Sequence, residues 1–256
     1  MIFKAKFGEP KRGWVVIVHG LGEHSGRYAK LVEMLVERGF AVYTFDWPGH
    51  GKSSGKRGHT SVEEAMEIID EIIEEIGEKP FLFGHSLGGL TVIRYAETRP
   101  EKVKGVIASS PALAKSPNTP GFLVALAKFL GVVAPGITFS NGINPNLLSR
   151  NKDAVRRYVE DPLVHDKITA KLGRSIFMNM ELAHREAEKI KVPILLLVGT
   201  QDVITPPEGA RKLFEKLKVE DKEIREFEGA YHEIFEDPEW GEEFHRVIVE
   251  WLEKHS

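Results

Sequence analysis

The sequence alternates short apolar runs with amphipathic helical patterns, and this alternation limits the folds that the chain can adopt. The run WVVIVHG (Trp14–Gly20) is rich in β-branched residues and ends in glycine, as is typical of a strand buried on both faces. The run FAVYTFD (Phe40–Asp46) is a second strand of this kind, and a helical pattern that ends at Gly39 lies between the two. Buried strands separated by helices predict an α/β fold with a mostly parallel central sheet flanked by helices.

The same rhythm continues along most of the chain. Ser61 and Glu64 form a capping box ahead of an apolar stripe that ends at Ile76, which predicts a helix. The further expected strands are 80–86, 102–111, 192–202 and 222–232, and the further expected helices are 87–99, 208–217 and 240–254. We therefore assign residues 1–111 and 191–256 to one core domain.

The rhythm breaks in residues 112–190, where no clear buried strand is found. We interpret this segment as a mainly helical cap (lid) inserted into the core. It contains GFLVALAKFLGVVAPGI (Gly121–Ile137), which is apolar almost all round except at Lys128. The segment is too short and too interrupted for a membrane span. It is either a buried helix or a helix whose outer face meets lipid or an acyl chain.

Composition excludes several classes of partner and site. A chain of 256 residues with 42% hydrophobic content can bury one large core without a disulfide or a metal. The formal net charge is -3 and no basic tract is present, so nucleic acid is not an expected partner. With no cysteine, the chemistry must use oxygen and nitrogen groups. Many charged residues and no cysteine suit a thermostable protein.

The first residues, MIFKAKFGEPKRGW, carry scattered charges and no apolar core of signal-peptide length. The sequence therefore favours a cytoplasmic protein, with peripheral membrane association through the cap as an extension of that expectation.

Ser86, in PFLFGHSLGG, is the candidate nucleophile. It lies where a strand ends and a helix begins, at the carboxyl edge of the sheet, where open α/β folds bind ligands. Gly84 and Gly88 leave room for the sharp turn, because a β-carbon at either would crowd the strand against the helix. A serine hydroxyl needs a base and an orienting carboxylate before it can attack.

His232 is the candidate base, and Asp202 is the candidate carboxylate. Each follows a late strand, and the order Ser86, Asp202, His232 is the order of a nucleophile-elbow hydrolase. Taken singly, Asp202 could be a turn residue and His232 a surface histidine, so the prediction depends on the combination. His50 and His85 lie on glycine-rich turns and are not expected to be the base.

Ester or amide chemistry also needs donors for an oxyanion. The backbone N–H of Leu87 follows the nucleophile at the start of its helix, where the helix dipole favours negative charge. A second N–H is expected from the loop HGLGEHSGRY (His19–Tyr28), which follows an early strand.

Six segments of the chain form a distinctive combination. They are HGLGEHSGRY, DWPGHGKSSG (Asp46–Gly55), GHSLGG, LSRNKDAVRRYVEDPL (Leu148–Leu163), VGTQDVITPP and EGAYHEIFED. Together they resemble the monoacylglycerol lipases and related lysophospholipases of the α/β-hydrolase fold. The first and fourth segments are the most specific, and the resemblance runs from about Trp14 to the C-terminus.

The resemblance implies roles for further residues. It implies that Leu21 gives the second oxyanion N–H, and that Glu23, Arg27 and Tyr158 surround the polar head of a glyceride. Their alternative roles are a surface ion pair and a packed cap aromatic. It also implies that DWPGHGKSSG is a structural turn that supports the site.

The expected function is hydrolysis of a monoacylglycerol, or a similar lipid ester, through an acyl-enzyme on Ser86. No metal and no organic cofactor are expected, and the cap is expected to take the acyl chain and to touch a lipid surface transiently. A lysophospholipase or broad carboxylesterase would use the same residues. A non-catalytic ligand-binding homologue is a more remote alternative. Dehalogenase and epoxide-hydrolase chemistry is disfavoured, because it needs an aspartate in place of Ser86.

Overall fold

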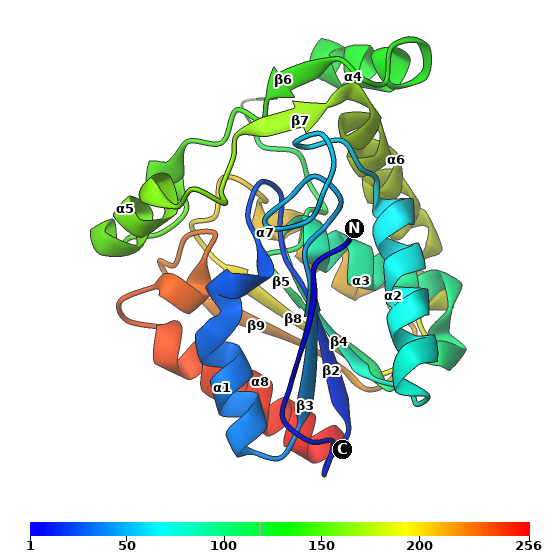
Figure 1. The fold of residues 1–256 in the computed structure, drawn as a ribbon, viewed down its shortest axis with the longest axis vertical. Coiled ribbons are helices and arrows are strands. Elements are labelled where there is room, and N and C mark those ends of the chain that lie inside the picture. The colour runs from blue at the N-terminus through cyan, green and yellow to red at the C-terminus, as the bar shows by residue number, and fades with distance from the viewer. Residues whose placement is uncertain (118) are drawn as a thin grey trace.

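The computed structural model describes residues 1–117 and 119–256, and it has the α/β architecture that the sequence predicts. Seven strands form one sheet in the order β1-β3-β2-β4-β5-β8-β9 (Figure 1). Only β1 is antiparallel to its neighbour. The strands are β1 (Lys4–Phe7), β2 (Trp14–Val18), β3 (Ala41–Phe45), β4 (Phe81–His85), β5 (Gly105–Ser109), β8 (Ile194–Gly199) and β9 (Lys222–Phe227).

Helices cover both faces of the sheet, because the central strands are apolar on both. Along β2, Val16 and Val18 point into one apolar cluster, while Val15 and Ile17 point into the other. The first cluster is covered by α2 (Val62–Ile76), α3 (Leu87–Thr98) and α7 (Pro207–Lys216). The second is covered by α1 (Ala29–Glu37) and α8 (Gly241–His255), as Figure 1 shows.

The start of α2 illustrates how local sequence sets the elements. The Ser61 side chain accepts a hydrogen bond from the backbone N–H of Glu64, and the helix ends at Gly77, whose φ of 73° is left-handed. Ser61 is therefore confirmed as the N-cap, whereas the carboxylate of Glu64 bonds to Lys171, so only this half of the predicted capping box is observed. The edge strand β1 was not expected. This strand is four residues long and carries two lysines, which are common on edge strands. It therefore lacks the continuous apolar run by which the other strands were predicted.

The described residues of the segment 112–190, all but residue 118, add no strand to the main sheet. They form α4 (Gly121–Val133), β6 (Thr138–Ser140), α5 (Lys152–Glu160), β7 (Lys167–Thr169) and α6 (Ala170–Glu186). The short strands β6 and β7 pair with each other, and α4 packs on α6 at the end of the molecule that lies beyond the carboxyl ends of the parallel strands (Figure 1).

The interpretation of Gly121–Ile137 as a buried helix is wrong. No residue of α4 is buried, and Phe122 and Phe129 are 69% and 61% exposed. The reason is that α4 is packed on one side, against α6, and has no protein layer over its outer face. Among the described residues, no helix combines the length and the apolar character that crossing a membrane requires.

Candidate active site

Ser86 stands on the turn between β4 and α3, in a strained backbone conformation. Its φ of 56° and ψ of -114° lie outside the regions that non-glycine residues usually adopt. Its carbonyl oxygen accepts the backbone N–H groups of Leu90 and Ala112, so the turn is fixed from two directions. Such a turn lifts the hydroxyl away from the sheet edge.

Two glycines allow this turn. A β-carbon on Gly84 would lie 2.2 Å from the carbonyl oxygen of Gly88, and one on Gly88 would lie 2.0 Å from the carbonyl oxygen of Val18. Both contacts are with backbone, which cannot move aside. The structure therefore explains the spacing of the glycines in GHSLGG, and it shows that Gly88 packs the helix against β2.

The structure brings Ser86, His232 and Asp202 together. The Nε2 atom of His232 lies 2.9 Å from Oγ of Ser86, and its Nδ1 atom lies 2.8 Å from Oδ2 of Asp202. All three side chains are buried. A hydroxyl bonded to an imidazole that is bonded in turn to a buried carboxylate can pass its proton to the imidazole as it attacks an electrophile.

The charges of this series support that chemistry. Burial acts to lower the pKa of His232, but the charge of Asp202 and the hydrogen bond to it outweigh burial, so the pKa is raised. Burial acts to raise the pKa of Asp202, but the charge of His232 and hydrogen bonds from His232 and Thr205 outweigh burial and lower it. The carboxylate is therefore ionised and ready to stabilise an imidazolium.

Two residues that the sequence analysis missed hold this series in place. Thr205 donates its backbone N–H to Oδ1 of Asp202 at 3.0 Å, and its hydroxyl lies 2.8 Å from Oδ2 and 2.9 Å from the carbonyl oxygen of Ser110. The hydroxyl of Ser110, a residue with a φ of 41°, donates to the carbonyl oxygen of His232 at 2.7 Å. Their only sequence signal is proximity to a strand end.

The loop that carries Leu21 is held from two sides. The backbone N–H of Gly20 donates to Oε1 of Glu23 at 2.6 Å, and the carbonyl oxygen of Gly22 accepts the backbone N–H of His165 at 2.8 Å. Leu21 and Leu87 both line one cavity with Ser86. The two predicted oxyanion residues are therefore next to the predicted nucleophile.

Glu23 and Arg27 form a buried network and not a surface ion pair. Nη1 of Arg27 donates to Oε2 of Glu23 at 2.7 Å and to Oε1 of Glu233 at 2.7 Å, and Nη2 donates to Oε2 of Glu233 at 2.8 Å. The ring of Tyr158 lies 4.8 Å from the guanidinium carbon. The network joins the first loop to Glu233, the residue after His232, which the sequence analysis did not consider.

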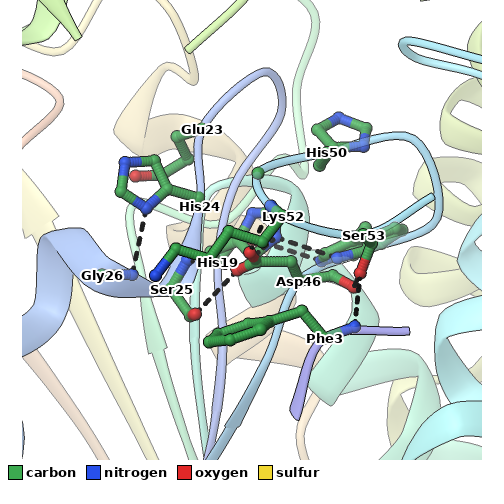
Figure 2. Close-up of polar contacts among 12 residues, drawn as sticks. Phe3, His19, Glu23, His24, Ser25, Gly26, Asp46, His50, Lys52 and Ser53 are labelled. Carbon is green, nitrogen blue, oxygen red and sulfur yellow. Dashed lines mark hydrogen bonds and ion pairs between the residues drawn. The ribbon is translucent and has the colours of Figure 1, made fainter. Parts of the chain in front are cut away.

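The turn DWPGHGKSSG supports the first loop through Asp46. Oδ1 of Asp46 accepts both the backbone N–H and the hydroxyl of Ser25, at 2.8 and 2.7 Å, and Oδ2 accepts the backbone N–H of Lys52 at 2.8 Å. Ser53 donates to the carbonyl oxygen of Asp46 and accepts from the N–H of Phe3 (Figure 2). These contacts agree with a structural role.

His50 and His85 are both buried, and neither is bonded to Ser86. Burial, followed by the charge of His19, lowers the pKa of His50 well below its ordinary value. Burial, followed by the charge of His232, lowers the pKa of His85 to about 3. Both imidazoles are therefore neutral. The histidine that is bonded to the hydroxyl of Ser86 is His232.

Two cavities meet at Ser86. A cavity of about 580 Å³ runs from Leu21, Ser86 and Leu87 toward apolar side chains of α4 and α6, including Leu123 and Phe177. A much smaller one, of about 10 Å³, shares Leu21 and Ser86 with the first. Its other lining residues are Gly20, Glu23, His85, Ile143, Leu148, Tyr158, His232 and Glu233. A third cavity, of about 530 Å³, lies between β1 and α1 and reaches none of the three bonded residues.

No metal centre is apparent in this site. Within residues 1–117 and 119–256, no group of three or more histidine, aspartate or glutamate side chains is arranged to hold a metal ion.

Comparisons with known proteins agree with this geometry. The model of the Hydrolase_4 family, described as serine aminopeptidase, S33, matches residues 9–239. A monoacylglycerol lipase of Mycolicibacterium smegmatis is 33% identical over 237 residues, which are 89% of this chain and 84% of that protein. An uncharacterized abhydrolase domain-containing protein of Dictyostelium discoideum is 33% identical over 245 residues; the match covers 94% of this chain but only 26% of that protein.

A solved structure gives a closer likeness. The crystal structure of a monoacylglycerol lipase from Paleococcus ferrophilus is 76% identical, has a TM-score of 0.99, and is matched over 100% of both chains. Together with the family match over most of the sequence, this likeness shows that the protein belongs to the serine hydrolase family of the α/β-hydrolase fold that includes monoacylglycerol lipases.

Proposed function

We propose that this protein hydrolyses the ester bond of monoacylglycerols to a fatty acid and glycerol, through an acyl-enzyme on Ser86. The observation that carries the proposal is the bonded series Ser86, His232 and Asp202 at the junction of a large, mostly apolar cavity and a small one that is lined by Glu23 and Glu233. One cavity suits an acyl chain, and the other lies where a short polar head would leave.

The proposed mechanism has two halves. Oγ of Ser86 attacks the ester carbonyl while Nε2 of His232 takes the hydroxyl proton, and His232 then gives that proton to the leaving glycerol oxygen. A water molecule next attacks the acyl-enzyme, again losing its proton to His232, which returns it to Oγ as the fatty acid leaves. Asp202 stabilises the imidazolium in both halves without becoming protonated.

The backbone N–H groups of Leu21 and Leu87 are proposed to bind the oxyanion of both tetrahedral intermediates. Leu87 is the first residue of α3, so its N–H has no acceptor within the helix. Loss of one such donor costs about 3 kcal/mol of transition-state stabilisation in comparable sites.

We propose residues 112–190 as the cap, with 1–111 and 191–256 as the hydrolase core. Side chains of α4 and α6 line the cavity of about 580 Å³, and most of its surface is apolar. A fatty acyl chain bound to Ser86 would therefore lie between the core and these two helices. The cap would supply most of the apolar contact that distinguishes a long acyl chain from a short one.

The small cavity is the proposed site of the glycerol head. Glu23, Arg27 and Tyr158 were expected there from the family resemblance; Glu23 and Tyr158 line the cavity directly, whereas Arg27 is bonded behind it. A cavity of about 10 Å³ scarcely holds one water molecule, so head-group binding requires side chains of the cap to shift.

We further propose that the cap touches lipid through α4. Its exposed apolar side chains recur at helical spacing, so they share one broad face of the helix; they are Phe122, Leu123, Leu126, Phe129, Val132 and Val133. A soluble protein seldom leaves so many large apolar residues together without a function. Contact with a lipid surface would place the opening of the acyl cavity, which Leu123 also lines, next to its substrate.

The function is tested with Ser86→Ala and a panel of substrates. Wild-type protein is expected to hydrolyse 1-monooleoylglycerol faster than a diacylglycerol, an aryl acetate or an amino-acid 4-nitroanilide. The variant is expected to lose several orders of magnitude in kcat while keeping its Tm. An organophosphate should label wild type, but not the variant, at one residue. Unlabelled wild-type protein would indicate a binding protein, and a preference for the anilide would indicate a peptidase.

A further inference from the structure

Glu233 is a buried carboxylate that the proposed mechanism does not use, although it lies beside the reacting atoms. It directly follows His232, is 3% exposed, and lines the small cavity together with Ser86, His232 and Glu23. A buried carboxylate at this position needs a physical explanation, because burying a charge is costly unless it is paired.

Part of the explanation is the pairing with Arg27. Three hydrogen bonds commit the guanidinium to Glu23 and Glu233, and the rings of Tyr158 and Phe235 lie 4.8 and 5.6 Å from its central carbon. Burial acts to lower the pKa of Arg27, but the charges of Glu233 and Glu23 outweigh burial and raise it. Arg27 therefore stays charged, and its charge is matched by protein carboxylates before any substrate arrives.

Glu23 and Glu233 share one guanidinium, and together they have more acceptor sites than the three hydrogen bonds that Arg27 donates to them. Burial acts to raise the pKa of Glu23, but the charge of Arg27 and the other contacts of this carboxylate, among them the hydrogen bond from Tyr28, together outweigh burial and lower the pKa to about 2, so Glu23 is ionised at neutral pH. Glu233 places a second carboxylate group against the same guanidinium, so one basic group faces two acidic ones.

A count of lone pairs shows where acceptors remain. Each carboxylate oxygen has about two acceptor sites. Oε1 of Glu23 uses both, on the N–H of Gly20 and the hydroxyl of Tyr28. From the residues that the structure describes, Oε2 of Glu23 and both oxygens of Glu233 each receive one bond, which Arg27 donates. Three acceptor sites therefore remain on carboxylates that line the small cavity.

We propose that Glu233, with Glu23, makes the head-group end of the site select a neutral polyol ester and reject an ester whose head carries a phosphate. The two free hydroxyls of a monoacylglycerol are donors, which match these acceptors. A phosphate carries negative charge and, when doubly ionised or diesterified, has no proton to donate. Glu233 is thus a specificity-determining residue that separates monoacylglycerols from lysophospholipids. The inference rests on the proposed function.

The test compares wild type, Glu233→Gln and a matched control, Glu236→Gln. Glutamine keeps the shape and one oxygen acceptor but removes the charge. Glu236 is a carboxylate three residues along the same loop that pairs with Arg157 and does not line the cavity. Each protein is assayed on 1-monooleoylglycerol, on 1-oleoylglycerol 3-phosphate, which carries the same acyl chain, and on 4-nitrophenyl butyrate, which has no glycerol head.

Wild type is expected to prefer the uncharged ester by at least about 100-fold in kcat/KM, because like charges a few ångströms apart in a partly desolvated site repel strongly. Glu233→Gln should narrow this ratio of kcat/KM values at least about 10-fold, and kcat/KM on the nitrophenyl ester should change by a smaller factor than the ratio does. Glu236→Gln should leave the ratio unchanged. Equal shifts in the two variants, or an equal loss on all three esters, would overturn the proposal in favour of a structural role for Glu233.

The wild-type comparison does not depend on the variant folding. If wild type cleaves both oleoyl esters equally well, the charge argument fails while the proposed function stands. If wild type cleaves the nitrophenyl ester but neither oleoyl ester, the proposed function itself fails.

Discussion

Oδ2 of Asp202 lies 2.8 Å from Nδ1 of His232, in a position where both side chains are almost completely removed from solvent. Oδ1 of the same carboxylate accepts the backbone N–H groups of Ile204 and Thr205, at 2.8 and 3.0 Å, so the carboxylate cannot rotate away. The imidazole is thereby fixed with Nε2 toward Ser86. Several consequences of this relationship can be measured.

Asp202→Asn should change both the rate and its pH dependence. His232 must be neutral to accept the proton of Ser86, and Asp202 raises the pKa of His232, so wild-type activity should be lost as pH falls through a value above 6.5. Without the carboxylate, the pKa of His232 falls, and the acid limb of the kcat/KM profile should move to lower pH. The rate at its plateau should fall about 10⁴-fold. An unmoved acid limb would show that another group titrates.

Thr205→Val should lower kcat by about 10-fold with little change in KM. The hydroxyl of Thr205 lies 2.8 Å from Oδ2 of Asp202, and a hydrogen bond to a charged group contributes about 1.5–3 kcal/mol. The acid limb of the pH profile should shift as well, because the carboxylate and the imidazole are coupled. Thr205→Ser keeps the hydroxyl and should restore most of the rate. Failure of the serine variant to do so would point to packing by the methyl group instead.

The main features of the fold and the candidate site were accessible from sequence for a physical reason. Buried parallel strands are continuous apolar runs, and functional side chains follow their carboxyl ends, so the order Ser86, Asp202, His232 could be interpreted with the strand pattern. The structure then places His232 within hydrogen-bonding distance of both Ser86 and Asp202.

Other residues were missed because their partners are distant in the sequence. Glu233 contacts Arg27, 206 residues away, and Ser110 contacts His232, 122 residues away. Neither contact leaves a periodic or local pattern, and no turn or cap rule applies to them. The exposure of α4 could not be predicted from the sequence for a related reason. A helix that is apolar almost all round has the same sequence pattern whether protein or lipid covers its outer face.

Gly88→Ala should destabilise the fold by more than about 3 kcal/mol, because the new β-carbon would lie 2.0 Å from the carbonyl oxygen of Val18 and would push α3 away from β2. Gly121→Ala is the matched control, because nothing lies within 4 Å of a β-carbon at that position. The control should change the free energy of unfolding by less than about 0.5 kcal/mol. Denaturant unfolding followed by circular dichroism measures both, and similar midpoints would contradict the close packing of helix on strand.

The double substitution of Phe122 and Phe129 by serine should weaken binding to lipid without harming the reaction centre. Both rings are more than 60% exposed on α4, and the free energy of transferring them from water into a lipid surface is about 1.5–3 kcal/mol each when complete. Sedimentation with phosphatidylcholine vesicles should show at least a 10-fold lower partition coefficient for the double variant. Its kcat on soluble 4-nitrophenyl butyrate should stay within about three-fold of wild type.

Phe7→Ser is the control for this experiment. Phe7 is 42% exposed on β1, the edge strand of the main sheet, so its substitution makes one Phe-to-Ser change at an exposed ring outside α4. Vesicle binding by Phe7→Ser should match wild type. If the two variants bind vesicles equally well, α4 is not the lipid-contacting surface. If the double variant instead loses nitrophenyl ester activity, its two rings support the acyl cavity from outside, because Leu123 on the same helix lines that cavity.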